Sequence, residues 1–355
     1  MKASMIGLDI AKSVFQAHGE DAAGRITLQR RLRRSQVKDF FAKLPPAQIG
    51  IEACGSAHYW GRELAALGHE VRLIPAAYAK PFVRRNKTDA RDAAAICTAL
   101  GRPDMRFVAV KSEAQQAARG LERSRDLLVR QRTQLANSVR SQLAEFGIIA
   151  PQGQRGFAGL AAAVADGTAA VPAALQEALG LLVQQIDRLA TAVALLEQRI
   201  VARVRVHPMM RRLTTIPGVG PLTAHAIVTA IGDGRQFASA RDFAAWCGLT
   251  RRVDQSADKR RERGISRQGD NAVRKLLVLG ASTTMRHLRC SPDRASHWQR
   301  GILARRPIKV AVVAQAAKNA RVAWALLRSG ECYRTQPSRQ TDSSNHGSPA
   351  PTAVA

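Results

Sequence analysis

Acidic residues are scarce in this chain. Its 355 residues include 27 aspartates and glutamates but 55 lysines and arginines, so its formal net charge is +28 and its pI is near 11.4. This excess of positive charge favours a polyanionic partner, either nucleic acid or an anionic membrane surface. The length allows two or three domains, each with its own core.

Long apolar runs and targeting signals are also lacking. The sequence has no uninterrupted stretch of about 18 apolar residues, which argues against a membrane span and leaves nucleic acid as the favoured partner. The amino-terminal segment MKASMIGLDIAKS has neither the apolar core nor the cleavage site of an export signal. We therefore expect a bacterial-type cytoplasmic protein that associates with the nucleoid and with no membrane.

Cysteine is too sparse and too scattered for a disulfide framework. The five cysteines show no C-x-x-C spacing, which also argues against a zinc site. They are Cys54, Cys97, Cys247, Cys290 and Cys332. We expect them to be small, buried, apolar residues in a reducing compartment.

Residues 1–110 alternate between strand-like and helix-like patterns. The apolar runs MIGLDI, QIGIEAC and HEVRLIP predict strands, and two further strands flank a turn at Asp21–Gly24. Helical patterns occur at QVKDFFAKL, at HYWGRELAALG and from near Thr88 onward. The order β-β-β-α-β-α-β-α predicts an α/β domain with a mixed sheet.

Residues 111–205 carry the clearest helical periodicity in the chain. Apolar residues recur at spacings of four and three, which is the narrow stripe of a coiled coil. This stripe consists of Leu175, Leu179, Leu182, Ile186, Leu189, Val193, Leu196 and Ile200. Its partner is either the helix over 111–146, folded back as an antiparallel hairpin, or the same helix of a second subunit. We favour the hairpin and expect it to support a homodimer or homotetramer, while the Gly- and Ala-rich residues 151–172 are expected to form a loop.

Residues 206–330 predict a second, helical domain. Within it, Gly218, Val219 and Gly220 separate two helical segments in the stretch TIPGVGPLTA. Two glycines around a small apolar residue let backbone N–H groups point outward at a helix start, which suits a DNA phosphate. The pattern is that of a helix-hairpin-helix, which binds the DNA backbone without reading sequence. A plain turn between two helices with a glycine cap is the alternative.

A strongly basic segment follows in the same domain. Residues 251–275 contain nine lysines and arginines and four acids, with glycine breaks at Gly264 and Gly269. We expect a loop that contacts phosphate through Lys259, Arg260 and Arg261. A solvated charged loop is the alternative. The tail, residues 331–355, is rich in Ser, Thr and Pro and is expected to be disordered.

Acids that are rare elsewhere gather after two predicted strands and at one helix start. Asp9 follows the strand MIGL, Glu52 follows IGI, and Asp89 and Asp92 lie three residues apart on one helix face. Phosphoryl transfer on nucleic acid commonly uses two Mg²⁺ ions about 3.5–4 Å apart, and hard ions prefer oxygen ligands. The pattern favours a two-metal site with the geometry of ribonuclease-H-like nucleases. Taken singly, the helix acids could instead be first-turn residues favoured by the helix dipole.

Basic residues stand close to these acids and along the next helix. Arg84, Arg85 and Lys87 precede Asp89 directly and are candidates for holding a nucleic-acid backbone against the metals. The helix over 111–146 carries further candidates for RNA or DNA contact. They are Arg119, Arg123, Arg125, Arg130 and Arg132.

Several segments together resemble one known family. They are GLDIAK, IEACGSAHYW, NKTDARDA, TIPGVGPLTA, FAAWCGLT and GISRQGDNAVRKLL, which occur in the family order and span the chain to about residue 330. On these segments the chain resembles a DEDD-type insertion-sequence transposase of the one-ten family. The resemblance implies a RuvC-like nuclease domain, a coiled coil and a carboxyl-terminal transposase domain, and it places the four family acids on the four carboxylates named above.

The resemblance also implies a serine nucleophile and a guide RNA. The family serine lies shortly after the Gly-Leu-Thr segment, and the matching position is Ser256 in QSADK, where many members have a richer serine and glycine stretch. Ser266 in GISRQG is the second candidate. No histidine lies near either serine, so the metal-bound carboxylates are the expected activators. Family members are guided by a noncoding (bridge) RNA that pairs with donor and target DNA.

The expected function is therefore a transposase or recombinase that cuts and rejoins DNA with Mg²⁺ and a serine. Two alternatives stay open. A structure-specific nuclease such as a Holliday-junction resolvase would use the same four acids with water as the nucleophile. A non-catalytic protein would bind nucleic acid through the glycine turn and the basic loop alone.

Overall fold

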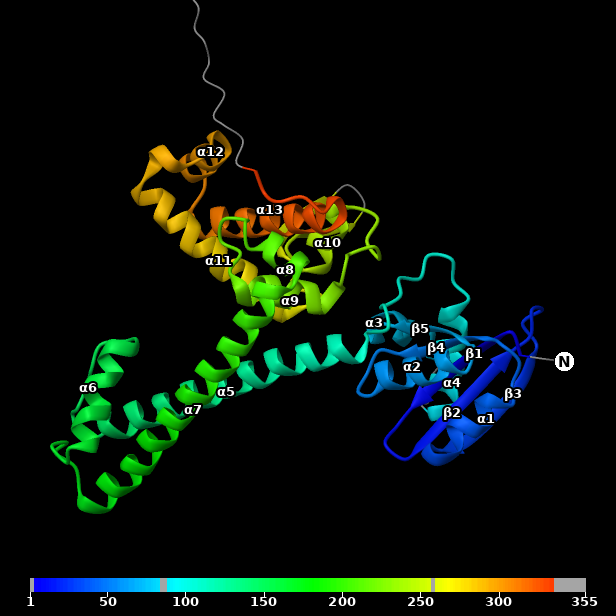
Figure 1. Cartoon of the computed structure of the whole chain (residues 1–355), viewed down its shortest axis with the longest axis horizontal. Helices are drawn as coiled ribbons and strands as arrows, with labels where there is room; N and C mark the ends of the chain where they lie inside the picture. Colours follow the sequence, from blue (N-terminus) through cyan, green and yellow to red (C-terminus); the bar gives the residue numbers. More distant parts are fainter. Residues whose placement is uncertain (1–2, 84–87, 257–258, 335–355) are drawn as a thin grey trace, which may run out of the picture. The chain divides into compact units, whose positions relative to one another are not determined.

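The computed structural model describes residues 3–83, 88–256 and 259–334 (Figure 1). The chain divides into two compact units. One contains Met1–Arg203 with Ala226–Ala238, and the other contains Val204–His225 with Ser239–Ala355. The expected phosphate contacts at Arg84, Arg85 and Lys87 lie outside the described residues, as does most of the tail that was expected to be disordered.

The first unit is built on a five-stranded mixed sheet with the strand order β3-β2-β1-β4-β5. Strand β1 pairs antiparallel with β2 and parallel with β4, and β4 pairs parallel with β5. The strands are β1 Met5–Ile10, β2 Val14–Glu20, β3 Ile26–Arg33, β4 Gln48–Glu52 and β5 Glu70–Ile74. The mixed α/β sheet predicted from the sequence is confirmed, and its strands and helices follow in the predicted order with one added short helix, α3 Ala76–Ala79, after β5.

Alternation along β1 sends its side chains to two different layers. Ile6 and Leu8 are buried in one core cluster with Trp60 and Leu64 of α2. Gly7 instead faces α4, because a Cβ at Gly7 would lie 2.1 Å from the carbonyl oxygen of Ala93. The helices of this unit's sheet domain are α1 Val37–Ala42, α2 Ala57–Ala66, α3 Ala76–Ala79 and α4 Asp89–Leu100.

Three longer helices follow in the same unit: α5 Glu113–Ala144, α6 Gln154–Ala165 and α7 Ala173–Val206 (Figure 1). Helices α5 and α7 run antiparallel. Near one end the Arg125 Nε donates to Glu197 Oε1 at 2.7 Å, and further along Val139 of α5 shares a core cluster with Leu179 of α7.

The segment expected to be a loop between these helices is largely helical. Helix α6 lies within residues 151–172, and its Leu160 and Val164 are buried in the cluster that α5 and α7 form. Alanine has the highest helix propensity of the amino acids, and two apolar residues four apart present one face for packing. The loop prediction was wrong because the spacing of Leu160 and Val164, and not the Gly and Ala content, determines the structure of this segment.

Helix α7 is long and apolar enough, by length and composition alone, to cross a membrane. A core helix of a soluble protein passes the same test, so the observation carries little weight. Of the predicted stripe, Leu179, Ile186 and Ile200 are buried, whereas Leu181 and Leu195 outside the stripe are exposed.

The second unit is helical, with one added β-hairpin. Its helices are α8 Pro208–Leu213, α9 Pro221–Ile231, α10 Ala240–Trp246, α11 Asn271–Cys290, α12 His297–Arg305 and α13 Ile308–Ser329, and α9 continues into the first unit. Helix α13 packs against α11 and α10 along a face of small side chains that includes Ala316 and Ala320.

The basic segment expected to be a loop forms this hairpin. Strands β6 Arg251–Ser256 and β7 Lys259–Ile265 pair antiparallel. The carboxylate of Asp254 forms ion pairs with Arg252 at 3.1 Å and with Arg263 at 2.6 Å. The pair with Arg263 crosses from β6 to β7, and cross-strand pairs of opposite charge stabilise a sheet, whereas Arg252 lies on β6 together with Asp254. The loop prediction was wrong because this charge pairing becomes visible only once the register is known.

The prediction that all five cysteines are buried was wrong for three of them. Cys97 and Cys247 are buried, and burial raises the pKa of the Cys97 thiol to about 12. Cys54, Cys290 and Cys332 are exposed. All five are free thiols, in agreement with the absence of a disulfide pattern.

Candidate metal centre

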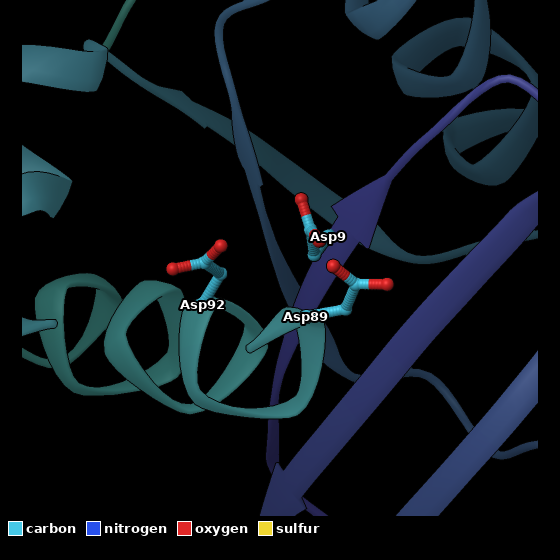
Figure 2. Close-up of side chains that lie close together, drawn as sticks. All are labelled: Asp9, Asp89 and Asp92. Carbon is cyan, nitrogen blue, oxygen red and sulfur yellow. The ribbon is translucent and has the colours of Figure 1, made fainter. Parts of the chain in front are cut away.

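Three carboxylates meet at the end of β1. One ligand oxygen from each of Asp9, Asp89 and Asp92 lies within 4.8 Å of the other two. Figure 2 shows Asp9 near the tip of the β1 arrow and the other two side chains on the first turns of α4. Asp9 and Asp92 are half-buried and Asp89 is exposed, so the cluster is open to a ligand.

The start of α4 is set by local chemistry. Thr88 is extended and its hydroxyl accepts a hydrogen bond from the Arg91 N–H at 3.4 Å, which caps the helix. The two aspartates therefore occupy the first turn, where the helix dipole favours negative charge. Their spacing of three places both on one face. The first-turn role and the metal-ligand role are compatible in the same residues.

Glycine in β1 brings this helix to Asp9. Gly7 precedes Asp9 by two positions and so faces the same way, toward α4. A Cβ there would also lie 2.4 Å from the Cys97 nitrogen, so the α4 backbone lies directly on the strand. Gly7 is a functional residue that the strand pattern alone does not reveal, although a glycine inside a strand is a known sign of close backbone approach.

Glu52 adjoins the cluster without joining it. Leu8 of β1 is in register with Ile51 of the parallel strand β4, so the next two residues, Asp9 and Glu52, are neighbours on the sheet. The oxygens of Glu52 are not among those that meet within 4.8 Å. Glu52 nevertheless shares the electrostatic environment of Asp9. Partial burial of the Cys54 thiol raises its pKa, and the negative charges of Glu52 and Asp9 raise that pKa further.

The donor set fits a hard divalent cation. Three carboxylate charges this close repel one another unless a cation lies between them. Oxygens at about 2.0–2.6 Å from one ion can lie up to about 5 Å apart, which accommodates the observed separation. Sulfur and imidazole donors are absent from this group, so it suits a hard divalent cation better than zinc.

The two candidate serines occupy different parts of the β-hairpin. Ser256 is the last residue of β6 and is in register with Lys259 of β7. Ser266 lies just beyond β7, is half-buried, and donates its backbone N–H to the Thr250 carbonyl at 2.8 Å. Of the predicted phosphate contacts, Lys259, Arg260 and Arg261 all lie on β7, and Arg261 is exposed.

The glycine turn of the second unit has a packing role as well. Gly218 has a positive φ of 85°, and a Cβ on Gly280 of α11 would lie 1.7 Å from the Gly218 carbonyl oxygen. Val219 is buried. Gly220 is exposed with open space around it. Of these three residues, Gly220 is therefore the exposed one.

Two arginines of α5 that are candidates for nucleic-acid contact form ion pairs with glutamates of the first unit. The Arg119 Nη1 donates to Glu122 Oε2 at 3.1 Å, and Glu122 Oε1 accepts from the Thr229 hydroxyl at 2.8 Å. Arg125 pairs with Glu197 of α7. These two guanidinium groups are engaged, whereas Arg123 and Arg130 are exposed.

Comparison with known proteins agrees with this geometry. The family model DEDD_Tnp_IS110, described as a transposase, matches residues 6–148, which include all four acids. A second model, the transposase IS116/IS110/IS902 family, matches residues 210–298.

Full-length relatives are similar over nearly the whole chain. A probable family 20 transposase of Pseudomonas aeruginosa is 46% identical over 94% of this chain and 99% of the relative. The transposase for insertion sequence element IS1328 of Yersinia enterocolitica is 36% identical over 93% of this chain and 98% of the relative. The transposase for IS1111A of Coxiella burnetii is also 36% identical, over 93% and 91%. The chain therefore belongs to the IS110 family of insertion-sequence transposases, and membership of this DEDD-type DNA transposase family implies a divalent metal ion.

Proposed function

We propose that this transposase cuts and rejoins DNA strands by magnesium-dependent phosphoryl transfer, with Ser256 as the nucleophile. The observation that carries the proposal is the meeting of three carboxylates within 4.8 Å at the end of β1. Asp9, Asp89 and Asp92 would hold the metal, and Glu52, their neighbour on β4, is the fourth candidate ligand. When bound, two magnesium ions supply positive charge to the attacking and leaving oxygens.

The serine step makes one bond and breaks one. The Ser256 oxygen bonds to the scissile phosphorus as the bond from that phosphorus to a deoxyribose oxygen breaks. A serine hydroxyl is a weak nucleophile without a base, so its proton passes to a carboxylate of the metal centre, of the same or another subunit. The departing oxygen takes up a proton. Attack by the hydroxyl of another DNA strand reverses the step, frees the serine and rejoins the DNA.

The place of Ser256 in the hairpin supports it over Ser266. It is the last residue of β6, one of two paired basic strands that suit a DNA backbone. Ser266 is half-buried beyond β7, where its backbone is tied to Thr250. A nucleophile that must reach a DNA phosphate is better served by the position on the basic strand.

Ser256→Ala is expected to abolish strand exchange while leaving DNA binding unchanged, because only the attacking oxygen is removed. The measurement is a strand-exchange assay with Mg²⁺, together with a denaturing gel that detects a covalent protein–DNA adduct. Ser266→Ala is the matched control and should retain both the adduct and the exchange.

Two outcomes would contradict this assignment. Full exchange by Ser256→Ala with loss in Ser266→Ala would move the nucleophile to Ser266. Full DNA cleavage by both variants, without any adduct, would favour a Holliday-junction-resolvase-like nuclease with water as the nucleophile.

Several further elements serve DNA binding in this proposal. Gly220 with α8 and α9 forms a helix-hairpin-helix that holds one phosphate, and the basic strand β7 contacts the backbone through Lys259, Arg260 and Arg261. Arg84, Arg85 and Lys87, which precede α4, hold the strand against the metals. The proposed domains are a nuclease domain over 1–110, a coiled-coil region over 111–205 and a transposase domain over 206–330. The protein acts in the cytoplasm, at the nucleoid, as a homodimer or homotetramer joined through the coiled coil.

A noncoding bridge RNA is the second proposed partner, supported by the family and by the net charge of +28. The purified protein is expected to carry RNA of discrete length, and ribonuclease treatment should abolish exchange at the natural target. Sequencing of the RNA that copurifies is the measurement, with restoration by the RNA transcribed from the ends of the element as the control. Undiminished target-specific exchange after complete RNA removal would contradict this partner.

A further inference from the structure

A basic hollow lies beside the metal centre, at the same edge of the sheet. It consists of two concavities that share Lys12 and Arg34. The hollow is lined by Lys12, Ser13, Arg34, Ser56, Tyr59 and Trp60. No sequence pattern indicates this hollow, because its cations come from separate turns that only the sheet brings together.

The sheet topology explains why the hollow and the acids are neighbours. Strand β2 runs antiparallel to both β1 and β3, and β4 runs parallel to β1, so β1, β3 and β4 all end at one edge. Lys12 follows β1 and Arg34 follows β3. The hollow is also lined by Ile10 and Cys54, which come one residue after Asp9 and two after Glu52. Asp9 faces α4, whereas Tyr59 and Trp60 belong to α2 on the other face of the sheet, so a strand bound at both places crosses the end of β1.

The two cations are exposed and available. The Arg34 guanidinium lies 5.2 Å from the centre of the Trp60 ring and 5.7 Å from that of Phe15, so aromatic faces hold it in place. Within residues 3–83, 88–256 and 259–334, neither Lys12 nor Arg34 is paired with a carboxylate. Lys38 at the rim differs, because it forms an ion pair with Glu63.

An aromatic ring stands next to these cations. Tyr59 is 38% exposed, whereas its neighbour Trp60 is 3% exposed and supports it edge to face at 5.2 Å between ring centres. A ring fixed in this way and open to solvent suits stacking with a nucleic-acid base, which is worth about 1–3 kcal/mol in other proteins. Proteins that bind single-stranded nucleic acid commonly combine cationic side chains with an aromatic ring that stacks on a base.

We propose that the hollow binds the unpaired DNA strand next to the scissile phosphate. Lys12 and Arg34 hold its phosphates, and Tyr59 stacks on one base. The helix dipole of α2, which begins at Ala57 after the Gly55–Ser56 turn, adds to the attraction for a phosphate. The inference rests on the proposed function, since DNA cleavage at the carboxylates is what makes this strand the occupant.

Photocrosslinking on the full-length protein tests the site directly. A single-stranded DNA oligonucleotide that carries 5-iododeoxyuridine is irradiated with the wild-type protein, and the modified peptides are sequenced by mass spectrometry. We expect an adduct on Tyr59. Adducts elsewhere on the chain with none in the hollow would overturn the proposal, whatever the variants do.

A matched pair of double variants tests the two cations. Lys12→Ala with Arg34→Gln and the control Arg30→Ala with Lys43→Ala each remove two positive charges, so long-range attraction changes equally. Arg30 is exposed on β3. Lys43 lies between α1 and the start of β4, at the end of the sheet opposite to the hollow. We expect the first pair to lower the Tyr59 adduct yield at least about 10-fold. The slope of the logarithm of the binding constant against the logarithm of salt concentration should fall in magnitude by about 1.4. The control pair should change each of these two quantities by less than half as much. Equal effects of the two pairs would overturn the proposal.

Two further arms separate this inference from the proposed function. Asp9→Asn removes a metal ligand but should leave the Tyr59 adduct intact. We therefore expect this variant to lose DNA cleavage and to crosslink normally at Tyr59. Wild-type protein that crosslinks at Tyr59 yet never cleaves DNA would count against the proposed function and not against binding in the hollow. An RNA oligonucleotide of the same sequence is the second arm, and crosslinking of RNA in preference to DNA would overturn the assignment to a DNA strand.

Discussion

Asp9→Asn is expected to abolish Mg²⁺-dependent DNA cleavage and strand exchange without unfolding the protein. Asp9 is the strand-borne member of the cluster, and its oxygen lies within 4.8 Å of those of Asp89 and Asp92. Metal ions contribute several kcal/mol to a phosphoryl-transfer transition state, and each 1.4 kcal/mol is about tenfold in rate. We therefore expect the rate to fall at least about 10³-fold. The asparagine keeps the size of the side chain and removes one charge from a crowded site.

The same substitution should separate metal binding from folding. Without metal, the melting temperature should stay unchanged or rise slightly, because one of three mutually repelling charges is gone. With added Mg²⁺ or Mn²⁺, the wild-type protein should be stabilised by binding, by about 2.7 kcal/mol at a metal concentration 100 times the Kd, and the variant should lose that gain. Differential scanning fluorimetry with and without metal measures both effects.

Asp39→Asn is the matched control for this experiment. Asp39, in the first turn of α1, is an exposed acid outside the carboxylate cluster, so the same Asp-to-Asn change there removes one negative charge and leaves the cluster intact. Its loss should cost a few tenths of a kcal/mol in stability and nothing in cleavage. Wild-type cleavage by Asp9→Asn, or an equal loss in Asp39→Asn, would contradict the metal centre.

The sheet could be predicted from the sequence because its central strands β1 and β4 are largely buried. Runs such as MIGLDI and QIGIEAC are short, apolar and separated by clear helical patterns, so both the type and the order of elements follow from burial. The hairpin β6–β7 lacked this signal, since its strands are mostly charged and exposed. Helix α6 was missed because its glycines and alanines resemble a linker until the spacing of Leu160 and Val164 is considered.

The candidate site could be predicted only as far as backbone geometry determines it. Strand ends and helix spacing suffice to bring Asp9 near Asp89 and Asp92. The separation of Glu52 from that group depends on side-chain conformation, which no sequence pattern specifies. Lys12 and Arg34 are 22 positions apart and become neighbours through the pairing of β1, β2 and β3, so their cooperation could be recognised only in the folded sheet.

Gly7→Ala tests whether the position of α4 on β1 creates the site. A Cβ at Gly7 would lie 2.1 Å from the Ala93 carbonyl oxygen and 2.4 Å from the Cys97 nitrogen. Both atoms are backbone, so no side-chain rotation relieves the clash and the helix must move. Overpacking of a core costs about 1–3 kcal/mol where side chains can yield, and we expect at least the upper end of that range here. Displacement of α4 would carry Asp89 and Asp92 away from Asp9 and remove metal binding and cleavage together.

Two other glycines make this prediction graded. A Cβ at Gly50, the register partner of Gly7, would meet only side-chain atoms of Ile96, Ile74 and Leu100 at 3.2–3.3 Å, so Gly50→Ala should be milder. A Cβ at Gly120, inside α5, would meet nothing within 4 Å, so Gly120→Ala should stabilise the protein by about 0.5–1 kcal/mol. Hydrogen exchange of the α4 peptides, measured beside the metal-dependent melting shift, reads the helix directly. Slow exchange and a normal metal response in Gly7→Ala would show that the carboxylates assemble without close contact between α4 and β1. Effects that decrease in the order Gly7, Gly50, Gly120 would show that the close approach of the two backbones assembles the carboxylates.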